Sequence, residues 1–452
     1  MNPSSNANMN RRSFLRAAAA SVAAPAILPS SALGLANRPA PGNRINVGVI
    51  GLGGRGNALL RSFVGKSEVQ ITAICDVHDE HYRDREWGKG KATFGTAPNL
   101  ELVNSHYARN KSGGKFRGCK VYADHRNLIA DKNVDAVIVA TPDHWHALQV
   151  LEALRAGKDV YCEKPLTHAF AEGQAIYREV AKRKAIFQTG SQQRSYWNFR
   201  RAVEIVQNGL IGKVSRVEVG LPAGHNECQG PEVVQEPPAN LNYEAWCGPS
   251  EKLPYIAARH HRHWRWHLAY GGGNLMDWIG HHNDIAHWGM QFDKTGPIEV
   301  DASGWTWSET DVYDSMVDYS VKSRYANGSV IEINSKFTKG TKWIGEDGWV
   351  YVTRGKITAS NQEWVKKDFK TGKSAYTSDD HTQNFLDGIK SRKECICSAE
   401  TGHRSITPGH LGYVSAKLGR KLKWDPKKEI VKGDAEANRL LKPIYRYPWS
   451  FA

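Results

Sequence analysis

The first half of the chain contains short, nearly continuous apolar runs that alternate with longer amphipathic stretches. Five of these runs predict β-strands, at residues 45–50, 69–75, 134–140, 158–162 and 185–189. The amphipathic stretches between them, such as residues 171–183, have helical spacing. Strands that are apolar on both faces and alternate with helices are typical of a parallel sheet covered by helices on both sides. The sequence therefore predicts a doubly wound α/β domain, with ligands bound at the carboxyl ends of its strands.

Beyond Tyr196 the pattern changes to strands in which apolar and polar residues alternate. These strands are expected at residues 215–221, 298–302, 314–321, 329–337 and 348–353. Such alternation is typical of an antiparallel sheet with one solvated face. Helical patterns return at residues 381–391 and 402–422. We therefore expect a second, α+β domain with a large, mostly antiparallel open sheet.

The change of pattern places the domain boundary near residue 195, with a first domain at 37–195 and a second at 196–452. Two segments have no role that can be read from the sequence. Residues 78–120 resemble a helix with a long surface insertion. Residues 259–267 are dense in His, Trp and Arg, which could bind sugar or carboxylate groups or form a packed loop. These residues belong to a Pro-, His- and Trp-rich stretch at 224–270, which we expect to form a loop over an active site.

Composition narrows the classes of partner. The 452 residues carry a formal net charge of +15, but Lys and Arg are scattered, without a long basic run or basic–aromatic alternation, so nucleic acid is not the expected partner. The chain has 15 Trp, whose flat apolar faces suit sugar rings, although many must belong to the core. The seven Cys contain no C-x-x-C pair, and no metal site is expected.

The N-terminal residues carry a targeting pattern. Residues 10–16 read Asn-Arg-Arg-Ser-Phe-Leu-Arg, which resembles the twin-arginine export signal. Small residues after an alanine-rich run allow cleavage near Gly34 or Ala36. Pro25 and Pro29 interrupt the apolar run, which is too short to span a membrane. We expect residues 1–36 to be a signal peptide for export of the folded protein to the periplasm by the twin-arginine machinery; a disordered basic tail is the alternative.

A glycine motif follows the first strand. Gly51, Gly53 and Gly56 have the spacing G-x-G-x-x-G, and the second strand ends about 20 residues later in Asp76. In a strand–turn–helix setting these glycines allow a tight turn, close approach of a pyrophosphate and helix packing, while the carboxylate accepts the ribose hydroxyls of NAD. We therefore expect the turn to bind NAD through Gly51, Leu52, Gly53, Gly54, Arg55 and Gly56 together with Asp76. A glycine-rich turn that binds no ligand is the alternative.

Two further groups can carry chemistry. Glu163-Lys164-Pro165 follows the strand at 158–162, where a lysine can donate to a substrate oxygen, although Lys before Pro is more often a solvated surface residue. Asp277 and His281 are four residues apart on a predicted helix and can orient each other, the carboxylate fixing the imidazole tautomer. A metal-binding helix or a satisfied core histidine is the alternative, the metal being weaker because H-x-x-x-H spacing is absent between His281 and His287.

The ordered combination of Gly51-x-Gly53-x-x-Gly56, Thr141-Pro-Asp-His-Trp-His146, Glu163-Lys164-Pro165 and Gly-Gly-x-x-x-Asp277-x-x-x-His281 resembles the Gfo/Idh/MocA family of glucose–fructose oxidoreductase and inositol dehydrogenase relatives. The ending, which includes His381-x-x-Asn384, resembles a secreted bacterial branch. The resemblance implies a Rossmann domain followed by an α/β domain whose open sheet covers the site and often mediates homo-oligomers.

The resemblance also implies roles for single residues. Lys164 and His281 are the expected oxygen-orienting and proton-transfer residues, with Asp277 holding the substrate or His281. The residues implied to bind the cofactor beyond the glycine turn and Asp76 are Thr141, Pro142, His144, His146, Glu163, Lys164, Gln192 and Arg194. Asp76 favours NAD, because a 2′-phosphate would meet a carboxylate, although some exported relatives use NADP.

Three functions remain open at this point. The leading hypothesis is a periplasmic oxidoreductase that transfers hydride between tightly bound NAD(P) and a sugar, glycoside or polyol hydroxyl. The second is a glycoside hydrolase that uses NAD for transient oxidation and elimination. The third is a non-enzymatic sugar-binding module on a relict nucleotide-binding fold. Because the periplasm supplies no NAD pool, we expect the nucleotide to stay bound through many turnovers.

Overall fold

A computed structural model describes residues 39, 41–82, 92–109 and 114–451. The chain separates into one unit up to Arg44 and a second from Ile45 to Ala452, and the fold described below is that of the second unit. The expected signal peptide lies outside the described residues, as does part of the insertion expected at 78–120.

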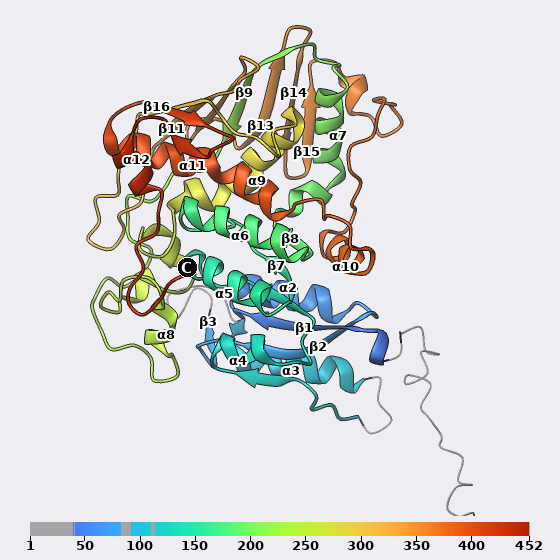
Figure 1. Cartoon of the computed structure of the whole chain (residues 1–452), viewed down its shortest axis with the longest axis vertical. Helices are drawn as coiled ribbons and strands as arrows, with labels where there is room; N and C mark the ends of the chain where they lie inside the picture. Colours follow the sequence, from blue (N-terminus) through green and yellow to red (C-terminus); the bar gives the residue numbers. More distant parts are fainter. Residues whose placement is uncertain (1–38, 40, 83–91, 110–113, 452) are drawn as a thin grey trace, which may run out of the picture. The chain divides into compact units, whose positions relative to one another are not determined.

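The first sheet contains six parallel strands (Figure 1). Their order is β5-β2-β1-β6-β7-β8, from Lys120–Tyr122, Val69–Cys75, Ile45–Ile50, Ala136–Val139, Asp159–Cys162 and Phe187–Thr189. β1 and β6 are neighbours at the centre of the sheet. The chain adds β2 and β5 on the β1 side and β7 and β8 on the β6 side, so the strand order reverses between β1 and β6. In doubly wound sheets this switch point opens a crevice at the carboxyl ends of the strands. The predicted parallel sheet is confirmed, and β5 is an additional strand that begins at the last residue of the insertion.

Helices connect the strands of this sheet. They are α2 (Gly54–Val64), α3 (Thr96–Ala108), α4 (His125–Ala130), α5 (Asp143–Arg155) and α6 (Phe170–Arg183). A separate two-stranded ribbon pairs β3 (His81–Tyr82) with β4 (Thr93–Phe94). The strands of the sheet are buried on both sides, as in β6, where all four residues are inaccessible to solvent. The strand sequences are nearly continuous apolar runs because the strands are buried on both faces.

The second sheet has nine strands in the order β15-β14-β13-β9-β12-β11-β10-β16-β17. In that order the strands are Lys356–Ala359, Trp349–Thr353, Gly340–Gly345, Val214–Gly220, Val330–Asn334, Ser320–Arg324, Glu299–Ser303, Leu422–Asp425 and Ile430–Val431. β9 and β12 run parallel, and the other neighbouring pairs described run antiparallel. The predicted large, mostly antiparallel sheet is confirmed.

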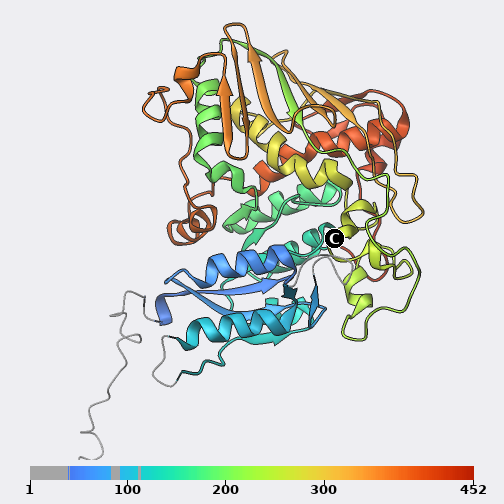
Figure 2. The same ribbon diagram turned by 180° about the vertical axis from the view of Figure 1, so that it is seen from behind.

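Helices cover one face of this sheet. α9 (Gly273–Met290) and α11 (Ala399–Leu418) lie side by side against it, as both views show (Figures 1 and 2). Side chains that point to these helices are buried, such as Val217 and Trp343, whereas those on the other face include Arg216 and Glu332. The remaining helices are α7 (Trp197–Gln207), α8 (Tyr243–Cys247), α10 (His381–Ser391) and α12 (Ala435–Leu440). Apolar and polar residues therefore alternate along these strands because one face of the sheet packs against helices and the other is polar.

One expected strand is placed differently. The sequence predicts a strand at residues 314–321, but β11 begins at Ser320. The amides of Asp314 and Ser315 donate instead to the carbonyl of Trp266, and Val317 donates to Thr306. Residues 314–317 therefore pair with loop segments, including an isolated antiparallel bridge between Met316 and Trp307, and are not part of the large sheet.

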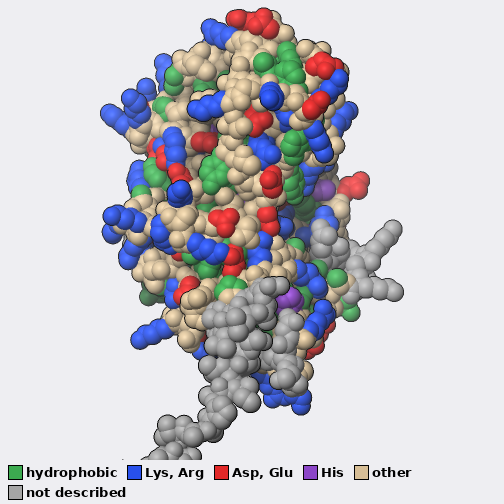
Figure 3. All heavy atoms as spheres, turned by 90° about the vertical axis from the view of Figure 1, so that its right-hand side faces the viewer, with side chains coloured by type: hydrophobic (Ala, Val, Ile, Leu, Met, Phe, Trp, Pro, Cys, Tyr) green, Lys and Arg blue, Asp and Glu red, His purple; other side chains and the backbone are tan. Residues whose placement is uncertain are grey.

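The surface shows mixed charge. On the face drawn in Figure 3, Lys and Arg side chains are interspersed with Asp, Glu and apolar side chains. Within the described part of the chain, no helix combines the length and apolar character needed to cross a membrane.

Candidate functional site

A cavity of about 1180 Å³ lies at the carboxyl ends of β1, β2, β6 and β7. Its walls include the glycine turn after β1, Asp76 after β2, Thr141 after β6 and Lys164 after β7. The opposite wall comes from α9 and from residues 260–266, most of which belong to the short 3-10 helix η4 (His261–Trp266). The volume exceeds that of a typical pocket for one small ligand.

The glycine turn is shaped for close approach of a ligand. Gly51 has a φ of +85°, and a Cβ there would lie 2.7 Å from the backbone of Ala140 and Thr141. A Cβ on Gly56 would lie 1.8 Å from the carbonyl oxygen of Gly51. At Gly53, by contrast, a Cβ would meet no atom within 4 Å, so the backbone faces open space beside the start of α2. Unpartnered amides at a helix N-terminus attract phosphate groups.

Asp76 is fixed next to this turn. Its carboxylate accepts hydrogen bonds from the backbone amides of Leu52, at 2.5 Å, and His78, at 3.0 Å. Burial raises the pKa of Asp76, and these two hydrogen bonds oppose the rise. A carboxylate on the cavity wall at the end of β2 can accept hydrogen bonds from ribose hydroxyls.

Three of the expected cofactor residues form one network. Glu163 Oε1 accepts from Arg55 Nε at 2.7 Å and from Gln192 Nε2 at 2.8 Å. Gln192 also donates to the hydroxyl of Tyr161 at 3.1 Å. Arg55, Glu163 and Gln192 all line the cavity, so the network ties the helix after the glycine turn to the end of β7.

Lys164 and Asp277 meet across the cavity wall. Lys164 Nζ donates to Asp277 Oδ1 and to the Asp277 carbonyl oxygen, both at 2.8 Å. Arg265 Nε donates to the same carboxylate oxygen at 3.1 Å. Burial alone would raise the pKa of Asp277, but the charges of Lys164 and Arg265 outweigh it and hold that pKa well below its usual range. The lysine ammonium is thereby oriented at the edge of the cavity, with one of its three protons left to donate.

His281 lies one helical turn beyond Asp277 on α9 and also lines the cavity. Lys164 and Arg265 both donate to Asp277 Oδ1. His281 Nδ1 has no hydrogen-bond partner among the described residues, so the expected hydrogen bond from that nitrogen to Asp277 is not formed. Burial, together with the charges of Lys164 and Arg354, lowers the pKa of His281 well below its ordinary value. The ring is therefore neutral at pH 7 and can accept a proton.

Some residues of the Thr141–His146 motif line the cavity and others do not. Thr141, Pro142 and His146 line the cavity, and both ring nitrogens of His146 contact carbonyl oxygens, of Pro165 at 2.8 Å and Thr141 at 3.0 Å. His144 does not line the cavity; its nitrogens contact the carbonyls of Trp246 and Tyr270. Burial lowers the pKa of His144 to about 3. His144 therefore holds the loop over the site against α5.

Arg194 also lies away from the cavity. Its guanidinium is 1 % exposed and donates to both carboxylate oxygens of Asp284, at 2.7 and 3.0 Å. A second pair of hydrogen bonds, both 2.8 Å long, reaches Asp293. Leu52 and Gly56 likewise support the turn from outside the cavity lining. Arg194 thus fastens the segment after β8 to α9 instead of facing a ligand.

Several cavity residues had not been singled out as site residues. They are Tyr196, Asn274, Trp278, Arg265, Arg354 and Asp143. Burial, with the charge of Asp277 adding to it and that of Arg265 opposing it, raises the pKa of Asp143 to about 8. The signal for Asp143 was present, since it stands inside the Thr141–His146 motif. Arg265 belongs to the dense segment at 259–267, where the sequence offered no way to select one residue.

Comparison with known families matches the chain in two parts. Residues 45–191 match the model of the Gfo/Idh/MocA oxidoreductase family described as an NAD-binding Rossmann fold. Residues 196–451 match the model described as the C-terminal α/β domain of the same oxidoreductase family.

Curated relatives extend the comparison. A myo-inositol 2-dehydrogenase of Thermotoga maritima is 31% identical over 169 residues, which cover 37% of this chain and 42% of the relative. A glycosyl hydrolase family 109 protein of Stenotrophomonas maltophilia is 28% identical over 218 residues, covering 47% of this chain and 42% of the relative. The chain thus spans about two fifths of the length of each of these two relatives.

A solved structure has the same fold. The WlbA dehydrogenase of Bordetella pertussis, in complex with NADH and UDP-GlcNAcA, aligns with a TM-score of 0.58. The alignment covers 84% of this chain and 99% of the dehydrogenase at 17% sequence identity. At that identity the likeness concerns the fold alone.

Proposed function

This chain belongs to the Gfo/Idh/MocA oxidoreductase family, and from that membership we propose that it transfers hydride between a nicotinamide cofactor and a hydroxyl of a sugar, glycoside or polyol. The observation that carries the proposal is the meeting of Lys164, Asp277 and a neutral His281 in the cavity that also contains the glycine turn. A donor, its orienting carboxylate and a base are the groups that oxidation of an alcohol requires.

The residues at the switch point fit NAD. Gly53 leaves open space at the N-terminus of α2, where the amides would hold a pyrophosphate, and the Asp76 carboxylate would accept hydrogen bonds from ribose hydroxyls. NAD, when bound, accepts or returns the hydride at nicotinamide C4. Asp76 favours NAD over NADP, because it would repel a 2′-phosphate. We propose that the nucleotide remains bound between turnovers.

The protein's own residues then handle the proton and the oxygen. When a substrate hydroxyl is oxidised, its proton passes to the neutral ring of His281, while Lys164 donates a hydrogen bond to the same oxygen. Asp277 keeps the Lys164 ammonium in place through the 2.8 Å contact. In the reverse direction His281 returns the proton to the carbonyl oxygen. Asp277 therefore acts on Lys164 in this proposal, rather than on the imidazole.

The cavity wall suits a carbohydrate. Trp264, Trp266 and Trp278 contribute indole rings to the lining, and such rings stack against sugar faces. The similarity to a myo-inositol 2-dehydrogenase supports a polyol or sugar hydroxyl as the reacting group. Arg265 and Arg354, which also line the cavity, would favour substrates with acidic or strongly polar substituents.

A second candidate function has its own support. The glycosyl hydrolase family 109 relative favours a hydrolase that oxidises a glycoside transiently, eliminates the aglycone and then restores the sugar. In that reaction NAD ends in the state in which it began, so no net reduced cofactor accumulates. The cavity residues named above serve the oxidation step of both reactions, and the products distinguish them.

Export is the remaining part of the proposal. The Asn10–Arg16 pattern supports twin-arginine export of the folded protein to the periplasm. Membership of the family supports assembly of copies of the chain through the open sheet. Replacing Arg11 and Arg12 by Lys should retain the protein in the cytoplasm, whereas Lys replacement of Arg16 should leave it in the periplasmic fraction. Equal fractionation of the two variants would contradict the export route.

The deciding experiment begins with mass spectrometry of nucleotide released from the denatured protein. The holo-protein is then screened against sugars, glycosides and polyols while reduced nicotinamide absorbance and aglycone release are recorded together. Growth of the reduced-nicotinamide signal supports the oxidoreductase, and aglycone release without it supports the hydrolase. Sugar binding with neither signal, and without nucleotide, would leave only a binding module.

A further inference from the structure

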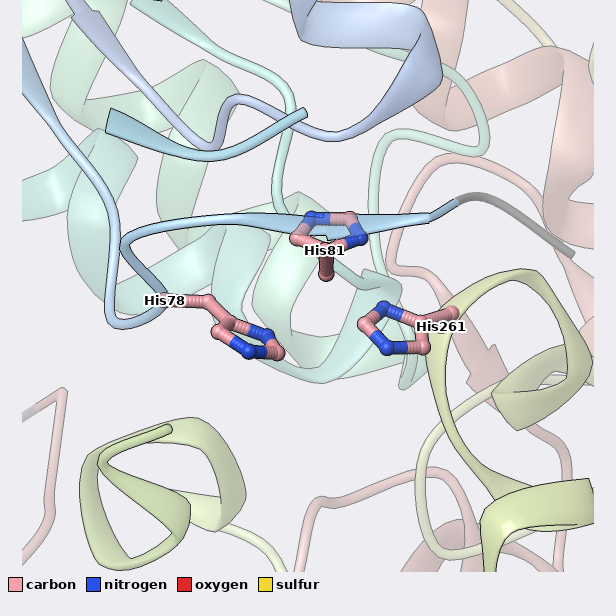
Figure 4. A group of neighbouring side chains, drawn as sticks. All are labelled: His78, His81 and His261. Carbon is pink, nitrogen blue, oxygen red and sulfur yellow. The ribbon is translucent and has the colours of Figure 1, made fainter. Parts of the chain in front are cut away.

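Three histidines converge on the wall of the cavity away from Lys164. His78 follows β2, His81 belongs to β3, and His261 begins η4 (Figure 4). One ring nitrogen of each lies within 4.8 Å of those of the other two. The rings are nearly parallel, with interplanar angles of 17–25°. They come from segments about 180 residues apart in sequence (261 − 78 = 183).

The backbone holds these rings in place. His78 is buried, its amide donates to Asp76 and its carbonyl accepts from Thr96 at 3.2 Å. His261 has a φ of +47°, a left-handed conformation that is uncommon for a residue with a Cβ. Strain of this kind is retained where surrounding structure requires a particular side-chain direction. At His261 it directs the imidazole toward His81, at a ring-centroid distance of 4.1 Å.

We propose that His78, His81 and His261 bind one zinc-class divalent cation. Imidazole nitrogens suit Zn²⁺, Cu²⁺, Ni²⁺ and Co²⁺, whereas Mg²⁺ and Ca²⁺ prefer oxygen. Zinc bound to nitrogens at about 2.0–2.1 Å in a tetrahedron holds them about 3.4 Å apart. The three nitrogens lie within 4.8 Å of one another, so side-chain rotations that close this gap and turn the nearly parallel rings toward one point would complete the site.

Hydrogen bonds on the far side of two rings match those of metal ligands. His78 Nε2 contacts Asn240 Oδ1 at 3.1 Å, and His81 Nδ1 contacts the carbonyl oxygen of Tyr82 at 3.2 Å. Each acceptor holds the ring proton on its own side, so the lone pair of the other nitrogen is directed elsewhere. Metal-bound histidines are commonly oriented by an acceptor in this way. His78 would therefore bind through Nδ1 and His81 through Nε2.

The cation would give the segment at 259–267 a role. Three histidines leave a fourth position, and all three residues line the cavity, so that position faces a water or an oxygen atom of a cavity ligand. The ion would also join η4 to the carboxyl end of β2, where the backbone of Asn242 already donates to Val77. The seven Cys gave no zinc signal because such signals rest on thiolate pairs, whereas this site contains histidines alone.

The test uses the untagged chain with Zn²⁺ and Co²⁺ as probes. Titration calorimetry and elemental analysis should show one tightly bound ion per wild-type chain. His81→Gln and His261→Gln should bind it more than about tenfold more weakly. His225→Gln is the matched control, because His225 lines the same cavity outside the cluster and should leave the affinity unchanged.

Far-UV circular dichroism accompanies each variant to establish that it folds. X-ray absorption of the zinc-loaded wild type gives an answer that requires no variant, since it should report imidazole nitrogens around the ion. The proposal would be overturned if the wild type retained no ion, if the ion had no imidazole nitrogen bound to it, or if folded His81→Gln and His261→Gln bound the ion as tightly as the wild type does. Metal binding is read here without turnover, so it is independent of the proposed oxidoreductase activity.

Discussion

Lys164 donates two hydrogen bonds to Asp277, one to the carboxylate and one to the backbone carbonyl, although 113 residues separate them in the sequence. The first residue follows the parallel sheet and the second belongs to the helix that covers the large sheet. Their contact therefore joins the two halves of the described fold at the cavity. It also places a cation beside His281 and helps to keep that ring neutral.

Replacing Lys164 should remove most of the turnover. Lys164→Met keeps the length of the side chain but has no donor for the substrate oxygen, so we expect kcat to fall about 10²–10⁴-fold. Asp277→Asn should cost less, because Lys164 keeps its contact with the carbonyl oxygen. Steady-state kinetics and retained nucleotide are the measurements, with the exposed Lys213→Met as control. Wild-type turnover in Lys164→Met would remove Lys164 from the mechanism.

The pH dependence of kcat/KM should reflect the neutral state of His281. Since its pKa lies well below the ordinary value, lowering the pH through 6.5 should not protonate it. We therefore expect kcat/KM for alcohol oxidation to stay flat through that pH, with the acid limb appearing only lower. The test is to measure kcat/KM for alcohol oxidation across a series of buffers of different pH in which the enzyme remains stable. A half-maximal rate near pH 6.5 would mean that the base has an ordinary histidine environment.

Two glycines of the turn should respond differently to alanine. Gly56→Ala places a Cβ 1.8 Å from the Gly51 carbonyl oxygen, so we expect a loss of about 1–3 kcal/mol or more in the free energy of unfolding. Gly53→Ala meets no protein atom within 4 Å and should leave the apo-protein's stability nearly unchanged while weakening NAD binding. Urea unfolding and nucleotide titration measure the two effects. Equal stability losses would contradict the geometry of the turn.

His410 should make stability depend on pH. Burial lowers its pKa to about 3, whereas an unfolded histidine titrates near 6.5. As the pH falls from 7 to 5 the unfolded chain gains a proton there and the folded chain does not, so stability falls. We expect this group to contribute about 2 kcal/mol of the change. The free energy of unfolding of His410→Gln should vary less between these pH values by that amount. An identical slope would show that His410 takes up its proton over the same pH range in the folded and unfolded chains.

The local pattern of apolar and polar residues was sufficient to predict most of the strands and helices. The runs at 45–50 and 69–75 are strands with those same bounds, because a strand buried on both faces is mostly apolar. The polar exceptions, Asn46, Gln70 and Thr72, are only partly buried. β13 was not predicted, since Gly340–Gly345 contains two glycines and a lysine around one buried Trp343. Its place in the sheet comes from pairing with β9 and β14, and such pairing leaves little trace in the strand itself.

The site shows the same division between local and distant causes. Helical spacing placed Asp277 and His281 on one face of α9, but it could not show that Lys164 and Arg265 would take the carboxylate. Arg194 stood near the expected cofactor residues in sequence, yet the buried carboxylate of Asp284 and the partly exposed carboxylate of Asp293 hold it elsewhere. Partners that are distant in sequence decided each of these placements.

The parallel pair of β9 and β12 has a consequence for how this site can diversify. Between these two strands the chain forms residues 221–272, then α9 and the strands β10 and β11. Because α9 packs on the sheet at β9 and β13, its position does not depend on the length of the preceding loop. Insertions or exchanges in residues 224–258 can therefore reshape the entrance for a new substrate while Asp277 and His281 stay in register with Lys164.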